Sequence, residues 1–68
     1  MAAATLKDWV SAHGRYLQEE SRLFELAGQV AAQACPLEEL ERQRDRFIAA
    51  QVLADALYER AMEMLRAG

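Results

Sequence analysis

Apolar residues recur at helical spacing on both sides of a single proline, Pro36. Before and after it they return every three or four residues, and at about 100° per residue each series forms one broad stripe. Proline has no N–H and its ring clashes with an earlier carbonyl, so it suits the first turn of a helix but not its interior. The pattern therefore predicts a helix over residues 5–34, a short turn at residues 35–36 and a second helix over residues 36–66.

Capping residues agree with these limits. Thr5 is a suitable N-cap, and Asp8 three residues later completes an acidic form of the capping box. Cys35 is the expected N-cap of the second helix. Arg66 near the last turn, followed by Gly68, marks its end.

The two stripes mirror each other when the chain is folded at residues 35–36. Large residues then mostly meet small ones, and polar residues meet polar ones, as in an antiparallel coiled coil. A single long bent helix is the alternative, but it leaves both stripes in water. We therefore predict an all-α fold, with residues 1–68 forming one coiled-coil-like antiparallel two-helix hairpin. The predicted layers include Phe24–Phe47, Glu20–Gln51, Leu17–Ala54 and His13–Tyr58.

Some apolar residues extend beyond what one neighbouring helix covers. Large contiguous apolar patches are rare on monomers, so we expect another chain to meet them, as a homodimer forming a four-helix bundle or as a different protein. Leu53, Leu57 and Met64 form such a strip on the second helix. Simple structural dimerisation through this strip and binding of a client helix to it both remain open. The candidate partner-binding residues are Trp9, Tyr16, Leu23, Leu53, Leu57 and Met64.

Size and charge narrow the class of protein. A chain of 68 residues is near the lower limit for an independent core, and 53% apolar with 28% charged residues fits an ordered helical chain. A net charge of -3 argues against nucleic acid, and the basic run 42–46 has acidic neighbours and is expected to be solvated. No apolar run is long enough to span a membrane, and the opening residues 1–4 lack a signal-peptide pattern. We expect a cytoplasmic protein.

Candidate chemistry is sparse. His13 and Glu20 interrupt the apolar stripe and are expected to be paired polar layers that fix register, although a pH-sensitive contact through His13 is an alternative. Cys35 stands at a helix N-terminus, where the dipole can lower a thiol pKa, but a lone cysteine is more often an incidental turn residue. No nucleophile–base pair or metal-ligand spacing occurs. We therefore predict no enzyme activity, no metal, no cofactor and no small-molecule substrate.

One family resemblance rests on the second half of the chain. A short hairpin with Pro36 opening an Ala-containing helix, as in Ile48–Leu53, resembles the small cochaperones of bacterial type III secretion needle subunits. This chain has Ala34 and Cys35 where that family has a glycine before the turn, and Leu40 where it has an aromatic residue. The resemblance implies a cytoplasmic protein that shields an aggregation-prone subunit before export, without enzymatic activity.

Three functions follow as hypotheses. The first is a non-enzymatic helical adaptor or cochaperone that covers an apolar helix of a partner protein. The second is a small homodimeric inhibitor, bacterial or phage-encoded, that blocks a transcription regulator or an enzyme. The third is a purely structural oligomerisation unit.

Overall fold

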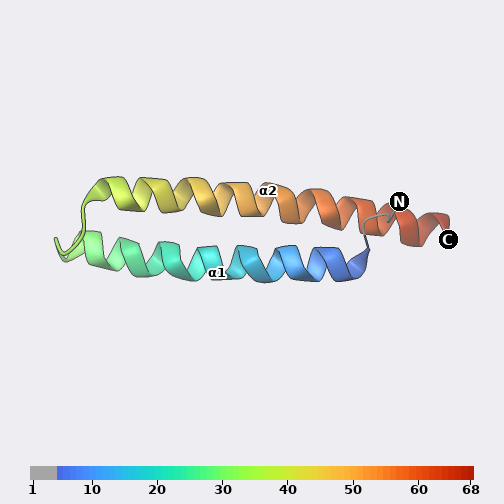
Figure 1. Cartoon of the computed structure of the whole chain (residues 1–68), viewed down its shortest axis with the longest axis horizontal. Helices are drawn as coiled ribbons and strands as arrows, with labels where there is room; N and C mark the ends of the chain where they lie inside the picture. Colours follow the sequence, from blue (N-terminus) through green and yellow to red (C-terminus); the bar gives the residue numbers. More distant parts are fainter. Residues whose placement is uncertain (1–4) are drawn as a thin grey trace.

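A computed structural model describes residues 5–68 as two antiparallel helices lying side by side (Figure 1). Helix α1 spans Leu6–Ala31 and helix α2 spans Leu37–Ala67. The hairpin is 52 Å long, and the start of α1 and the end of α2 lie at the same end. The predicted all-helical hairpin is confirmed. Residues 1–4, where no signal-peptide pattern was found, lie outside the described residues.

The start of α1 is fixed by the predicted capping box. The backbone N–H of Asp8 donates to the Thr5 hydroxyl at 3.3 Å, and the backbone N–H of Thr5 donates to the Asp8 carboxylate at 2.9 Å. Two backbone donors that the helix itself cannot satisfy are thereby paired.

The connection is longer than predicted. Helix α1 ends at Ala31, and the chain reverses through residues 32–36, with Gln33 in the left-handed region at φ 60°. Pro36 is extended and is the N-cap of α2, and its carbonyl accepts the N–H of Glu39 at 3.1 Å. The prediction of Cys35 as N-cap was therefore wrong. At the other end, Gly68 caps α2 as predicted, and its N–H donates to the Met64 carbonyl at 3.0 Å.

The two helices meet along what we call the seam, a series of buried and half-buried residues at alternating spacings of three and four. This spacing keeps one stripe of each helix facing the other over the full contact. In the described chain no large side chain is fully buried, and the most buried apolar residues are alanines that let the helices approach. From α1 the seam contains Trp9, Ala12, Tyr16, Glu19, Leu23, Leu26 and Val30, and from α2 Leu40, Gln43, Phe47, Ala50, Ala54, Leu57 and Ala61.

The predicted register was wrong. Phe47 contacts Tyr16, with ring centroids 5.2 Å apart, and not Phe24, which is 69% exposed. Tyr58 likewise contacts Trp9 at 5.5 Å. Two causes explain the shift. The turn takes five residues, which moves the point where the chain folds back, and the buried Gln43 amide is paired with Glu19 only in the observed register.

Candidate protein-binding face

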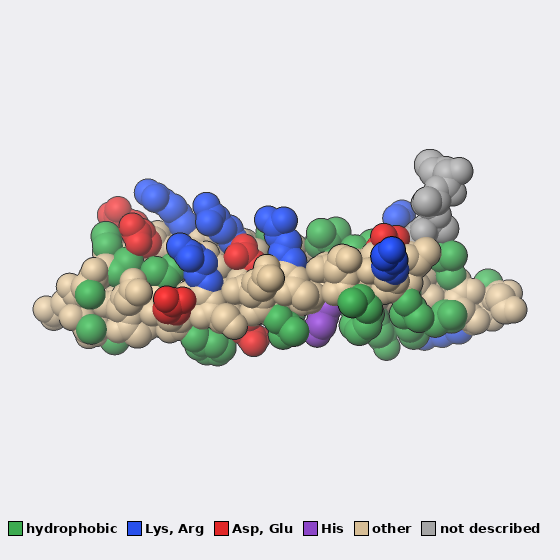
Figure 2. Space-filling view, turned by 60° about the horizontal axis from the view of Figure 1, so that its bottom comes forward, with side chains coloured by type: hydrophobic (Ala, Val, Ile, Leu, Met, Phe, Trp, Pro, Cys, Tyr) green, Lys and Arg blue, Asp and Glu red, His purple; other side chains and the backbone are tan. Residues whose placement is uncertain are grey.

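One side of the hairpin is lined by large apolar side chains that the seam does not cover. Most of them directly follow a seam residue, and the others stand one helical turn from the end of the seam. One residue corresponds to a rotation of about 100°, which carries these side chains to the same side on both helices because the helices are antiparallel. Figure 2 shows hydrophobic side chains along most of one edge and Lys and Arg side chains gathered along the other. We call this side the apolar face; its large members are between 42% and 69% exposed and are Leu6, Val10, Leu17, Phe24, Leu37, Ile48, Tyr58 and Leu65.

Polar groups interrupt the apolar face near its middle. His13 lies against the rings of Trp9 and Tyr16, at centroid distances of 5.2 and 5.7 Å. The Tyr16 hydroxyl donates to Glu20 at 3.5 Å, and desolvation, followed by the Glu20 carboxylate, raises the pKa of Tyr16. On α2, Arg44 forms an exposed ion pair with Asp45 at 3.3 Å. His13 and Glu20 are thus half-buried at the surface of the hairpin and do not form the internal layers that were expected.

The buried polar contact of the seam was not predicted. Gln43 is only 2% exposed, and its amide donates to the backbone carbonyl of Glu19 at 3.0 Å and to the Glu19 carboxylate at 3.3 Å. A satisfied amide among apolar residues favours one register, since sliding the helices would leave it unpaired. Its spacing from Leu40 and Phe47 was the available signal in the sequence, because 40, 43 and 47 follow the coiled-coil repeat.

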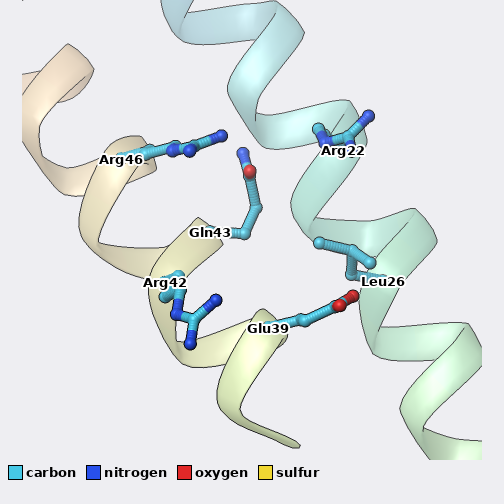
Figure 3. A pocket seen from close by; sticks show the side chains of 6 residues that line it. All are labelled: Arg22, Leu26, Glu39, Arg42, Gln43 and Arg46. Carbon is cyan, nitrogen blue, oxygen red and sulfur yellow. The ribbon is translucent and has the colours of Figure 1, made fainter. Parts of the chain in front are cut away.

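The opposite side of the hairpin carries four arginines beside the exposed Leu53, and we call it the arginine face after Arg15, Arg22, Arg42 and Arg46. Figure 3 shows a shallow hollow there, where Glu39 and Gln43 point from α2 toward α1. Within residues 5–68 the one ion pair is Arg44–Asp45, which involves none of these four guanidinium groups. The contrast between the two sides makes the hairpin amphipathic as a whole.

The six predicted partner-binding residues are not gathered on one surface. Trp9, Tyr16 and Leu23 are half-buried in the seam, where Trp9 and Tyr16 contact α2. The residues expected on α2 are also dispersed. Leu57 is half-buried in the seam, Leu53 is 52% exposed beside Arg15 and Arg46, and Met64 is 43% exposed near the end of α2. Their contact with another chain stays a prediction.

Sequence reasoning assigned most of the apolar face to the inside of the hairpin. Leu17 and Phe24 were expected to be core residues, whereas they are 45% and 69% exposed. A signal that distinguishes the two stripes of α1 is present in the sequence. The seam series contains the two large aromatic residues Trp9 and Tyr16, and a hairpin buries the stripe with more apolar area first.

The lone cysteine has a hydrogen bond that opposes reactivity. The Cys35 thiol donates to the Glu39 carboxylate at 2.9 Å. This hydrogen bond, followed by desolvation and the negative charge of Glu39, raises the pKa of Cys35. The expected effect of the helix dipole on this thiol is therefore outweighed by a neighbouring carboxylate.

Searches beyond the chain itself give no relative. No protein-family model, no curated protein and no solved structure matches this sequence. Among residues 5–68, no helix is long and apolar enough to cross a membrane, and no three His, Cys, Asp or Glu side chains lie where they would hold a metal ion. The exposed apolar face is therefore the feature of the described residues that indicates a function.

Proposed function

We propose that this protein is a non-enzymatic protein-interaction module, a small helical adaptor or cochaperone whose apolar face covers an amphipathic helix of a partner protein. The observation that supports the proposal is the exposure of Phe24, Leu17 and their neighbours along a whole side of the hairpin. Two helices side by side form a shallow groove, and an apolar helix laid into it is a recurrent mode of recognition.

The free energy available from this face is large for so small a protein. Phe24 keeps 69% of its surface in water, and covering that area contributes on the order of 3 kcal/mol at about 25 cal/mol per Å². Leu17 and Ile48 add further area on either side of the groove. A few such residues are enough to dominate the affinity of an interface.

Charge on the face defines the partner helix further. Glu20 on α1 and Arg44 on α2 carry opposite charges at the middle of the apolar face. A client helix with an apolar stripe, a cation that meets Glu20 and an anion that meets Arg44 satisfies both groups when it lies in the groove.

The test compares variants of the face with a matched variant of the arginine face. The chain is immobilised and used to capture proteins from cell extract, as wild type and as Leu17→Glu, Phe24→Glu and Arg15→Glu. A partner is then purified and titrated against each form. We expect Arg15→Glu to bind as wild type does, and each face variant to raise the dissociation constant by about a hundredfold or more.

Helicity of every variant is measured on the same samples by circular dichroism. Leu17 and Phe24 are exposed in the hairpin, so both variants are expected to remain helical. A purified partner that binds Leu17→Glu and Phe24→Glu as tightly as wild type contradicts the proposal. So does the absence of any captured protein that distinguishes the face variants from Arg15→Glu.

A further inference from the structure

We propose that, when no client helix is bound, a second copy of this chain covers the apolar face, with a two-fold axis running along the length of the hairpin. The proposal rests on the proposed function in that both assign the same face to protein binding. Helix α1 of each copy then lies on α2 of the other, and every helix of the resulting four-helix bundle has antiparallel neighbours.

This symmetry determines which residues meet. Rotation about the long axis leaves the position of each residue along that axis, here called its height, unchanged. Residues of α1 and α2 that stand at the same height within one copy therefore also stand at the same height across the two copies. The Tyr16–Phe47 ring contact and the Gln43–Glu19 hydrogen bond give those heights. From this register, Leu17 of one copy meets Ile48 of the second copy near the middle of the bundle.

Two charged groups of the face, Glu20 and Arg44, are complementary under the same rotation; a third, Asp55, lies beside His13 and Tyr58. Glu20 lies one residue beyond Glu19 and Arg44 one residue beyond Gln43, so they stand at nearly the same height on the two helices. In the dimer Glu20 of each copy meets Arg44 of the other. The opposite charges form two ion pairs related by the symmetry, and the exposed Arg44–Asp45 pair is weak enough to exchange for them.

The area of the face is sufficient for a stable dimer. The hairpin measures 52 × 17 × 14 Å, so its long sides have outlines of about 730 to 880 Å². Standard protein interfaces bury about 800 Å² on each partner. The hairpin also lacks any fully buried large side chain among residues 5–68, so the second copy supplies the core that one copy does not have.

Charge reversal across the interface is the decisive test. Glu20→Arg alone places Arg against Arg44 of the second copy, and Arg44→Glu alone places Glu against Glu20. Each variant is expected to raise the dissociation constant of its homodimer at least about a hundredfold. When the two variants are mixed, each reversed group meets an opposite charge on the other chain, so a heterodimer close to wild-type affinity is expected. Within each variant chain, positions 20 and 44 carry charges of the same sign, and mixing the two chains does not change that. Only a contact between chains therefore explains a recovery of affinity on mixing.

Glu25→Arg and Arg46→Glu make the same charge changes away from the apolar face and serve as controls. Phe24→Glu provides a second disruption that leaves the Tyr16–Glu20 hydrogen bond in place. Mass is measured by analytical ultracentrifugation and helicity by circular dichroism. Three results overturn the proposal: a monomeric wild type, a mixture no more dimeric than its components, or controls that weaken the dimer equally.

These outcomes are separable from failure of the proposed function. A monomeric wild type whose purified partner still depends on Phe24 leaves client binding intact and removes only the second copy. If the mixed charge-reversal variants dimerise as expected and a client binds Phe24→Glu as tightly as wild type, the proposed function is wrong and the dimer proposal stands. Because client and second copy occupy the same face, addition of a purified client is expected to separate the two copies of the dimer.

Discussion

The Tyr16–Phe47 contact identifies the register of the hairpin, and a double-mutant cycle measures it. Phe47→Ala removes a half-buried ring from the middle of the seam. A fully buried Phe→Ala change costs about 3–5 kcal/mol, and we expect about 2–3 kcal/mol here because Phe47 keeps part of its surface in water. A loss of this size is a large fraction of the total stability of so small a domain.

The coupling energy is the more specific quantity. Aromatic pairs in contact contribute about 0.5–1.5 kcal/mol beyond their buried area, so Tyr16→Ala and Phe47→Ala should be non-additive by that amount. Phe24 lies eight residues beyond Tyr16, or about 12 Å along α1. Phe24→Ala and Phe47→Ala should therefore be additive.

Urea unfolding followed by circular dichroism, at one fixed protein concentration, gives all the free energies of both cycles. The comparison is matched, since each cycle pairs Phe47→Ala with one aromatic truncation on α1. Coupling between Phe24 and Phe47, with none between Tyr16 and Phe47, would refute the register described above.

Three further predictions concern the helices and the thiol. Neither Gly14 nor Gly28 has an atom within 4 Å of an added Cβ, so each change to Ala should raise the free energy of unfolding by about 0.5–1 kcal/mol in urea unfolding, and a loss of stability would show an unrecognised close contact. Thr5→Ala removes the capping box and should cost about 1 kcal/mol in the same assay; an unchanged unfolding midpoint would argue against the cap. Because Glu39 raises the pKa of Cys35, less thiolate is present at neutral pH, and Glu39→Gln should speed alkylation of Cys35 by iodoacetamide and move the rate profile to lower pH. Equal profiles for the two proteins would contradict that hydrogen bond.

The hairpin itself was predictable because its signals are local. Pro36 cannot stand inside a helix, and Thr5 with Asp8 forms a capping box from residues three apart. The turn was less predictable, since Gln33 adopts a left-handed conformation that its residue type does not favour. As a result the connection was placed too close to Pro36.

Register and surface were harder to predict because they depend on competition between two apolar stripes of the same helix. On α1 the stripe through Leu17 and Phe24 and the stripe through Trp9 and Tyr16 lie about 100° apart, and a hairpin has room to bury only one of them. Periodicity found both stripes but did not rank them. The unburied one became the apolar face, so an error about the core was also an error about the candidate site.

Coverage of the apolar face by a second copy is measured by sedimentation equilibrium of the wild type beside Phe24→Glu and Arg15→Glu. Wild type and Arg15→Glu are expected to sediment with twice the 7.7 kDa mass of one chain over a wide range of concentration. Phe24→Glu should sediment as a helical monomer under the same conditions. A wild type that stays at the mass of one chain at the highest concentration, with the helicity of the hairpin, would contradict the claim.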